Sequence, residues 1–465
     1  MPVRLKLRDI AFFERPVHFA RPFRFGAITI NATPQLFVRV EIEVEGRGSS
    51  VGASAELLVP KWFDKRPELS PAQTVDGLRR SLQIARGLYL AQTGFQTAFE
   101  LHASCIGAQV VACTKENIPP LAAAYGPAEM DKAILDAVLR AAETNFFDGM
   151  AGNIAGIDAR LSSDLKAADI ARFLADRKPL QSVAIRHTVG LDDTVEGGGG
   201  VADARENAGA RYFKLKLAGY PAADAERLAR IGKELDTLGH DYKVTLDANE
   251  QYADLAALHA LIDRLDHEPA LRSISSSLLY VEQPMPRDIT RQSPLGSLAA
   301  RGFIIDEADD SYEAFPAARA LGYRGISSKS CKGLYKSIVN ATRAAKWSGG
   351  GEKFFVTGED LTCQAGLAVQ QDLALGAFIG IAHAERNGHH YVDGFGDAPA
   401  AEAQAFAAAH PDLYADAGQG VRLNIHNGDL LTGSLTATGF ATSVHPDWSA
   451  LAPLEQPKSL QEQLA

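Results

Sequence analysis

Charged residues end several short apolar runs in the second half of the chain, where they could act together. Lys214 and Lys216 alternate with apolar residues in "YFKLKLAG", so their side chains point to the same face of a strand. Acidic residues end the next three runs: Asp247 in "YKVTLDAN", Glu282 in "LLYVEQP" and Asp306 in "FIIDEA". Three carboxylates held close together repel one another unless a cation neutralises them. Hard oxygen ligands of this kind suit Mg²⁺.

The lysines could supply the proton transfer that complements such a metal site. A further lysine, Lys329, ends the run "GISSK". Lys216 and Lys329 come from either side of the three acids, so they can flank a ligand bound to the metal. A lysine acts as a base only if its pKa is lowered, and a neighbouring cation such as Lys214 or the metal has that effect. The alternative is that these lysines only neutralise the carboxylates.

The spacing of these residues predicts the elements that position them. From Lys216 to Lys329 the charged residues are 31, 35, 24 and 23 positions apart, and each step is the length of one strand and one helix. Eight short strands alternate with helical stretches from about residue 182. This pattern predicts an α/β fold, a modified TIM (β/α)8-type barrel, in which catalytic groups gather at the carboxyl ends of the strands. An open doubly wound sheet is disfavoured because no GxGxxG motif follows a strand.

The segments that flank the barrel have different patterns of apolar and polar residues. "QLFVRVEIEV" alternates and breaks at "EGRGSSVG", as a β-hairpin does. Apolar residues at helical spacing follow from about residue 70 to 174. We therefore expect an N-terminal α+β capping domain over residues 1–175, the barrel over 180–395, and a C-terminal segment over 396–465 that returns to the capping domain.

As a set, these motifs resemble the enolase superfamily, and more narrowly its muconate lactonizing enzyme and mandelate racemase-like members. The resemblance rests on K-x-K at 214–216, "LDANEQY", "VEQPMPRD", "IIDEA" and "SSKSCKG", and it covers nearly the whole chain. It implies that Asp247, Glu282 and Asp306 hold Mg²⁺. The ion would bind the substrate carboxylate and stabilise the enediolate formed when the α-proton leaves.

The resemblance also implies roles for other polar residues. Lys216 and Lys329 would be the acid/base pair on the two faces of the substrate. Asn249 and Glu307 match positions that orient the substrate or the metal ligands. Glu359, in "TGEDLTCQ", stands where substrate would lie. Loops of the capping domain, Arg21–Asn31 and Ala55–Pro67, would select the substrate and close over the site.

The sequence leaves the reaction open. The resemblance gives Lys214 an electrostatic role, and paired lysines fit racemisation or epimerisation as their simplest use. Cycloisomerisation of the muconate lactonizing type and dehydration of a hydroxy acid or acid sugar are the alternatives. No histidine ends "KFFVTGED", which favours the muconate lactonizing type, but Leu334 replaces the second glycine of a usual Gly-Gly pair. Two other classes stay possible: a metal-free aldolase with a Schiff-base lysine, and a non-catalytic barrel.

Composition limits the partners and the compartment. Acidic residues outnumber basic ones, 57 to 47, for a net charge of -10, which argues against nucleic-acid binding. No run is long enough to span a membrane, and the first residues do not read as a signal peptide. Four scattered cysteines without a CxxC pair are typical of reduced thiols. We expect a cytoplasmic homo-oligomer whose partner is a small-molecule carboxylate.

Overall fold

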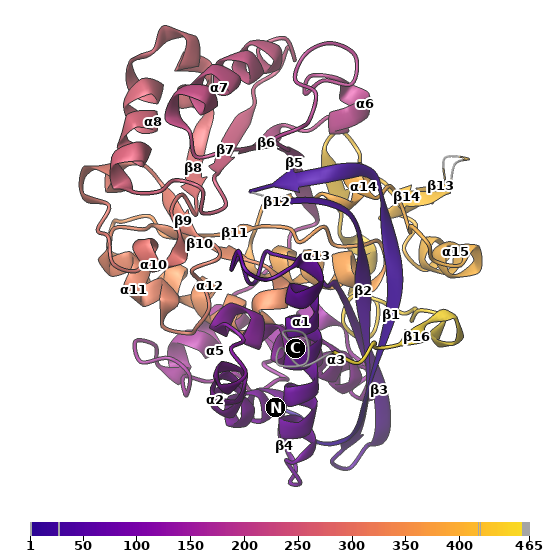
Figure 1. The fold of residues 1–465 in the computed structure, drawn as a ribbon. Helices are drawn as coiled ribbons and strands as arrows, with labels where there is room; N and C mark the ends of the chain where they lie inside the picture. Colours follow the sequence, from indigo (N-terminus) through magenta and orange to yellow (C-terminus); the bar gives the residue numbers. More distant parts are fainter. Residues whose placement is uncertain (1, 27, 417, 419, 458–465) are drawn as a thin grey trace.

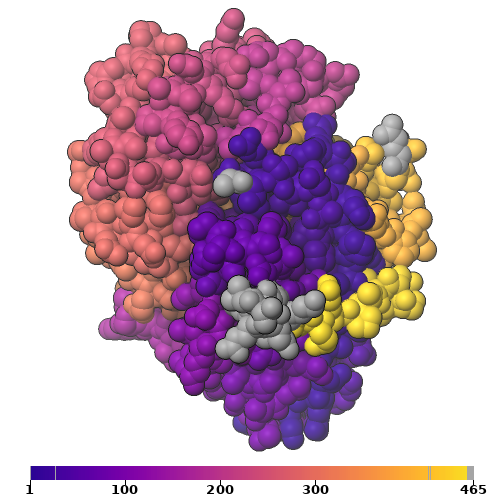
Figure 2. All heavy atoms as spheres, viewed as in Figure 1, coloured from indigo at the N-terminus to yellow at the C-terminus, as the bar shows by residue number. Residues whose placement is uncertain are grey.

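The computed structural model describes residues 2–26, 28–416, 418 and 420–457. Figure 1 shows a barrel of alternating strands and helices packed beside an antiparallel sheet that carries its own helices. In the space-filling view, the N-terminal strands lie between the barrel and the C-terminal segment (Figure 2).

The N-terminal part is built on three long antiparallel strands, β1 (Arg4–Phe25), β2 (Ile28–Val44) and β3 (Gly48–Leu57). Along β2, the buried residues Val38, Val40 and Ile42 alternate with partly exposed polar residues, the pattern of a strand with one face on a core. The hairpin predicted before residue 60 is therefore present. The tip of the β1–β2 hairpin reaches the barrel, where the Leu191 amide donates to the Arg24 carbonyl.

Helices complete the N-terminal part, and those nearest the sheet, α3 (Pro120–Ala141) above all, cover one of its faces. The helices are α1 (Pro71–Leu90), α2 (Ala98–Lys115), α3, α4 (Phe146–Ala151) and α5 (Ala167–Ala175), with the short strand β4 (Gln96–Thr97) between the first two. Capping boxes at Ser70 and Thr97 begin α1 and α2. Helix α3 lies so close to β3 that a Cβ added to Gly52 would be 2.2 Å from the Ala133 carbonyl oxygen.

Eight parallel strands close into the predicted barrel. Each strand pairs with the next along the chain, and the last pairs with the first. The strands are β5 (Ser182–Val189), β6 (Tyr212–Lys216), β7 (Lys243–Asp247), β8 (Leu278–Glu282), β9 (Phe303–Ile305), β10 (Gly325–Ser328), β11 (Phe355–Gly358) and β12 (His383–Glu385). The modified TIM barrel under a capping domain, predicted from the sequence, is confirmed.

The connections between the barrel strands are mostly helical, as the alternation predicts. The helices are α6 (Ala204–Asn207), α7 (Pro221–Leu235), α8 (Leu255–His267), α9 (Arg272–Ser277), α10 (Arg287–Thr290), α11 (Ala314–Ala320), α12 (Leu334–Ser348) and α13 (Leu367–Ile379). Their apolar residues pack on the outside of the strands, for example Leu228 and Ile231 of α7, which are fully buried.

The C-terminal segment divides between the two parts of the molecule. After α14 (Gly388–Tyr391) and α15 (Ala400–Ala409), β13 (Tyr414–Asp416) pairs with β14 (Val421–Leu423). Strand β15 (Asp429–Leu431) pairs antiparallel with β5 of the barrel. Strand β16 (Ala452–Pro453) pairs with β1 of the cap.

Two further sequence expectations concern cysteines and membranes. All four cysteines are buried and carry no disulfide. Among the helices of residues 2–457 that the structure describes, none combines the length and the apolar character needed to cross a bilayer.

Candidate active site

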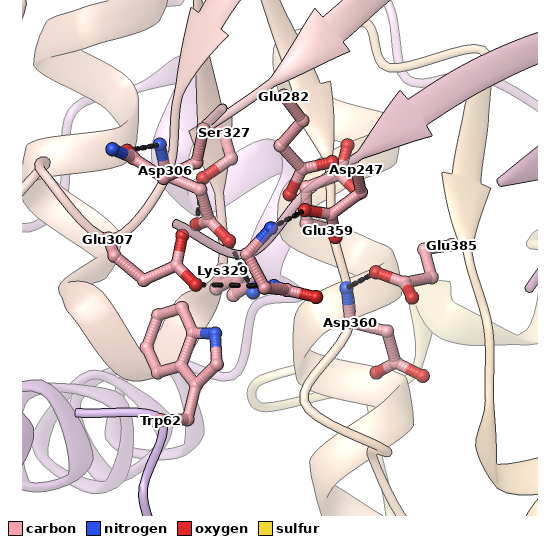
Figure 3. Close-up of polar contacts among 12 residues, drawn as sticks. Trp62, Asp247, Glu282, Asp306, Glu307, Ser327, Lys329, Glu359, Asp360 and Glu385 are labelled. Atoms are coloured by element: carbon pink, nitrogen blue, oxygen red, sulfur yellow. Dashed lines mark hydrogen bonds and ion pairs between the residues drawn. The ribbon is translucent and has the colours of Figure 1, made fainter. Parts of the chain in front are cut away.

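The carboxyl ends of the barrel strands bring the predicted charged residues together. Lys216, Asp247 and Glu282 stand opposite one another as register partners on β6, β7 and β8. Asp306 and Lys329 directly follow β9 and β10. Figure 3 shows the acidic side chains pointing into one region at the mouth of the barrel. All five residues are at most 5% exposed.

Lys214 lies in the middle of the carboxylates. Its Nζ lies 3.0 Å from Asp247 Oδ2 and 2.8 Å from Glu282 Oε2, and it also donates to Glu359 at 2.6 Å and to Glu385 at 2.8 Å. Burial lowers the pKa of this ammonium, but the four carboxylates outweigh burial and raise the pKa well above its usual value. Lys214 is therefore held as a cation on the floor of the site.

Lys216 lies nearer the mouth of the barrel than Lys214. Its Nζ donates to Asp247 Oδ2 at 2.6 Å and to Asn249 Oδ1 at 2.9 Å. Asn249 in turn donates from Nδ2 to Glu307 at 3.2 Å and has a left-handed backbone with φ of 43°. That backbone is uncommon for a residue other than glycine, and it turns the Asn249 side chain toward Lys216.

Lys329 approaches the site from the other side of the acids. Its Nζ donates to Asp306 Oδ2 at 2.7 Å, while Lys332 contacts Asp306 Oδ1 at 3.1 Å. Burial alone would lower the pKa of Lys329, but the Asp306 carboxylate outweighs it and raises the pKa, which is opposite to the lowered pKa expected of a base. The ring of Trp62, from the capping domain, lies 4.0 Å from the Lys329 ammonium, which is a cation–π contact. Figure 3 shows this tryptophan beside the lysine.

The two lysines share one small cavity of about 20 Å³. A water molecule needs about 10–15 Å³ of such space, so the cavity has room for little more than one water. Four cap residues and eight barrel residues line it: Phe23, Phe25, Val59, Trp62, Lys216, Asn249, Lys329, Asp360, Leu361, Thr362, Glu385 and Asn387. Of the cap residues expected to close over the site, Phe25 and Trp62 line the cavity. Arg24 instead pairs with Asp192.

Glu307 faces the cap. The Lys65 ammonium, from the cap loop that carries Trp62, donates to Glu307 at 2.7 Å and to the Asn249 carbonyl at 2.9 Å. It also lies 2.8 Å from Glu250. Sequence reasoning did not identify Lys65 or Glu250 individually, because only the folded loop brings them together.

Glu359 lies inside the barrel, beneath the mouth, and not in the cavity where the sequence analysis expected substrate to lie. It pairs with Arg186 of β5 through a short contact and accepts a hydrogen bond from the Tyr280 hydroxyl at 2.9 Å. Its other oxygen holds Lys214. Sequence reasoning missed Arg186, Tyr280 and the role of Glu385 as a partner of Lys214. The alternation of inward- and outward-facing residues along the strands could have indicated them, because each occupies an inward-facing position of a barrel strand.

The donor set fits Mg²⁺ chemically. Asp247, Glu282 and Asp306 offer carboxylate oxygens, and Glu282 Oε2 has the Lys214 ammonium at 2.8 Å as its ion-pair partner. Burial, reinforced by the Asp247 carboxylate, raises the pKa of Glu282 well above its usual value, and a cation held beside it would favour the ionised form. No three His, Cys, Asp or Glu side chains of the described residues already stand as a chelating group. Ammonium groups lie between the acids instead.

Comparison with known proteins gives structural likeness without sequence likeness. No protein-family model matches the chain, and no curated protein matches it significantly. Among solved structures, it is similar to a muconate lactonizing enzyme from Mycobacterium smegmatis complexed with muconolactone, at 16% identity and a TM-score of 0.63, over 97% of this chain and 100% of that one.

Two further structures that the chain resembles carry magnesium. One is an enolase superfamily member from Roseovarius nubinhibens, at 18% identity, TM-score 0.59 and coverage of 97% and 99% of the two chains. The other is a dipeptide epimerase from Methylococcus capsulatus with Mg and the dipeptide L-Arg-D-Lys, at 18% identity, TM-score 0.56 and coverage of 91% and 99%. The chain therefore has the fold of the enolase superfamily, a modified TIM barrel under an α+β capping domain.

Proposed function

We propose that the protein is a Mg²⁺-dependent enzyme that removes the proton α to a substrate carboxylate. The observation that supports this best is the placement of Lys216 and Lys329 in one cavity, from strands on either side of the three acids. Two proton carriers that face one small volume suit a carbon acid held between them. Structures of the same fold that contain magnesium add support from the fold alone.

Asp247, Glu282 and Asp306 are the residues that would hold the ion. When bound, Mg²⁺ draws negative charge from the substrate carboxylate and makes the α-proton more acidic. Lys214 would give up its contacts with Asp247 and Glu282 and keep those with Glu359 and Glu385. It would remain a nearby cation on the floor of the site.

The protein's own residues would then carry the proton transfer. One lysine, in its neutral form, takes the α-proton at Nζ, and the other, as an ammonium, delivers a proton to the opposite face of the same carbon. The result is racemisation or epimerisation. Trp62, Phe23 and Phe25 exclude water from the cavity. Cycloisomerisation or dehydration would need only one of the lysines as a base.

The test is α-proton exchange in deuterated water with Mg²⁺, over dipeptides, acid sugars and lactones, using both configurations at the α-carbon. We expect Lys216→Ala to abolish exchange from one configuration and Lys329→Ala from the other. Lys233→Ala, on the exposed face of α7, is the matched control and should exchange like the wild type. Chelation should stop exchange, and added Mg²⁺ should restore it.

Several outcomes would contradict the proposal. If each lysine variant loses exchange from both configurations, the two lysines do not act as independent bases, and a single-base reaction is favoured. Activity that survives chelation, together with a borohydride-trapped adduct on a lysine, would replace the proposal with Schiff-base chemistry.

A further inference from the structure

A second cavity lies at the opposite end of the barrel, where the strands begin. Its volume is about 600 Å³, within the range of about 300–1,000 Å³ common for ligand sites. Its walls come from the first residues of β8 and β11, from β12, and from the loops that lead into β9 and β10. None of its lining residues lines the active-site cavity, although Tyr280 also donates to Glu359 beneath that cavity.

Two glycines lie at the starts of neighbouring strands at this end of the barrel. Gly302, which lines the cavity, precedes β9, and Gly325 begins β10. A Cβ added to Gly325 would be 2.5 Å from Ile304 Cγ2 and 2.8 Å from Phe355 Cε2. Glycine therefore lets Phe355 lie across the barrel end, with its ring centroid 5.7 Å from that of Tyr280.

Apolar side chains form much of the wall. Leu279, Phe355 and Val356 line the cavity and are only partly buried, although the later residues of the same two strands are buried. Ile381 adds a further apolar contact. Partly exposed apolar residues in a concave site are what an apolar portion of a ligand would cover.

The polar part of the wall is rich in donors. Arg186 donates to His383 Nδ1 at 2.8 Å, and since a guanidinium only donates, the neutral imidazole carries its proton on Nε2. Burial, aided by the Arg186 charge, lowers the pKa of His383 to about 3. The ring is therefore neutral and fixed in one tautomer, with an N–H donor for the cavity.

Cations outnumber anions at the rim. Arg301, Arg324 and Lys353 line the cavity, against the single carboxylate of Glu352. Arg324 pairs with Glu352 at 2.6 Å, and Arg301 pairs with Asp266, which does not line the cavity. Lys353 has no ion-pair partner among the described residues, so its charge is available to a ligand. The rim thus complements an anion.

We infer that this cavity is a second binding site, for a small amphipathic anion whose carboxylate meets Lys353, Arg301 and His383 and whose aromatic or branched apolar body packs on Phe355 and Val356. The inference is independent of the proposed function, because it rests on residues at the other end of the barrel. The ligand class follows from the combination of an apolar wall, a fixed N–H donor and an excess of cations.

Calorimetric titration with phenylacetate and isovalerate, and with the uncharged phenylacetamide, tests the site. We expect phenylacetate to bind, and phenylacetamide to bind at least about tenfold more weakly because it forgoes charge-assisted hydrogen bonds. Val356→Trp, which fills the cavity, should abolish this binding. Lys353→Gln should weaken it about threefold, the effect of one exposed charge.

Controls separate this site from the catalytic mouth. Lys329→Ala alters the active-site cavity only, so it should bind phenylacetate as the wild type does. Thermal unfolding checks that each variant is folded. If Val356→Trp does not fold, Ala382→Phe at an exposed position of the same wall repeats the test. The inference is overturned if neither acid binds at millimolar concentration, if acid and amide bind equally, or if binding survives the filled cavity or is lost in Lys329→Ala.

Discussion

At the scale of single residues, the site depends on charges that compensate one another away from water. Glu359 is fully buried and holds two cations, Arg186 and Lys214. Removing one partner of such a set leaves an uncompensated charge in the interior, which costs far more than losing an exposed ion pair. The catalytic mouth therefore depends on a residue that does not touch the cavity.

Glu359→Gln should lower the free energy of unfolding by about 3–5 kcal/mol, since both buried cations lose a carboxylate. Urea denaturation at pH 7 measures the change. The matched control is Arg205→Ala, which breaks the ion pair with Asp203 at the surface and should leave the free energy of unfolding nearly unchanged. Equal losses of unfolding free energy in the two variants would show that the buried ion pairs of Glu359 stabilise the protein no more than an exposed ion pair does.

The contrast between Lys216 and Glu359 shows how far the sequence predicts this site. Lys216 and the acids stand at strand ends, and strand ends meet at one edge of any parallel barrel, so their proximity follows from local patterns. Glu359 also ends a strand, but its side chain turns inward toward Arg186, 173 positions earlier in the chain. No local pattern carries that pairing, because it depends on how the barrel closes.

At the scale of elements, the loop between β3 and α1 holds the capping domain onto the barrel. Trp62 lies over Lys329, and Lys65 reaches Glu307, Glu250 and the Asn249 carbonyl. The strands and helices around the loop are predictable from periodicity. The loop conformation is not, since partners on the barrel determine it.

Lys65→Met should loosen this loop. Amide hydrogen exchange over residues 58–70 should become about tenfold faster or more, because charged hydrogen bonds of about 1.5–3 kcal/mol each are lost. Lys61→Met is the control on the same loop, where the ammonium donates to the Arg66 carbonyl and not to the barrel. Equal protection in both variants would mean that Lys65 does not fasten the loop.

At the scale of the whole molecule, the cap and the barrel meet through a buried charge cluster. Lys132 of α3 lies 2.9 Å from Glu129 and 3.6 Å from Glu56 of β3, and its Nζ lies 3.5 Å from the Ser330 hydroxyl of the barrel. Asp372 of α13 also acts on Glu56. The Lys132 ammonium is thus the shared ion-pair partner of two buried carboxyl groups.

This cluster predicts a pH dependence of stability. Burial, which Lys132 only partly offsets, raises the pKa of Glu56 to about 8 and that of Glu129 to about 7. Between the ordinary value of 4.5 and these values, the folded protein binds more protons than the unfolded chain. This cluster should therefore contribute a fall in the free energy of unfolding of about 1 kcal/mol or more as the pH rises from about 5 to 8, whereas buried neutral histidines such as His383 contribute a rise up to their ordinary pKa.

Urea denaturation across that pH range compares the wild type with Glu56→Gln, which cannot ionise at this position. The free energy of unfolding of the wild type should fall relative to that of the variant as the pH rises. A difference between the two that stays constant over the range would contradict the prediction.

The closed catalytic cavity, with room for about one water molecule in its 20 Å³, has a kinetic consequence. In the proposed reaction, a carboxylic acid larger than this space would have to displace Trp62 and neighbouring cap residues on entry and again on exit. The rate would then include the friction of solvent against the moving cap. We expect turnover to slow in proportion to solvent viscosity when sucrose is added, and in Lys65→Met this sensitivity should shrink.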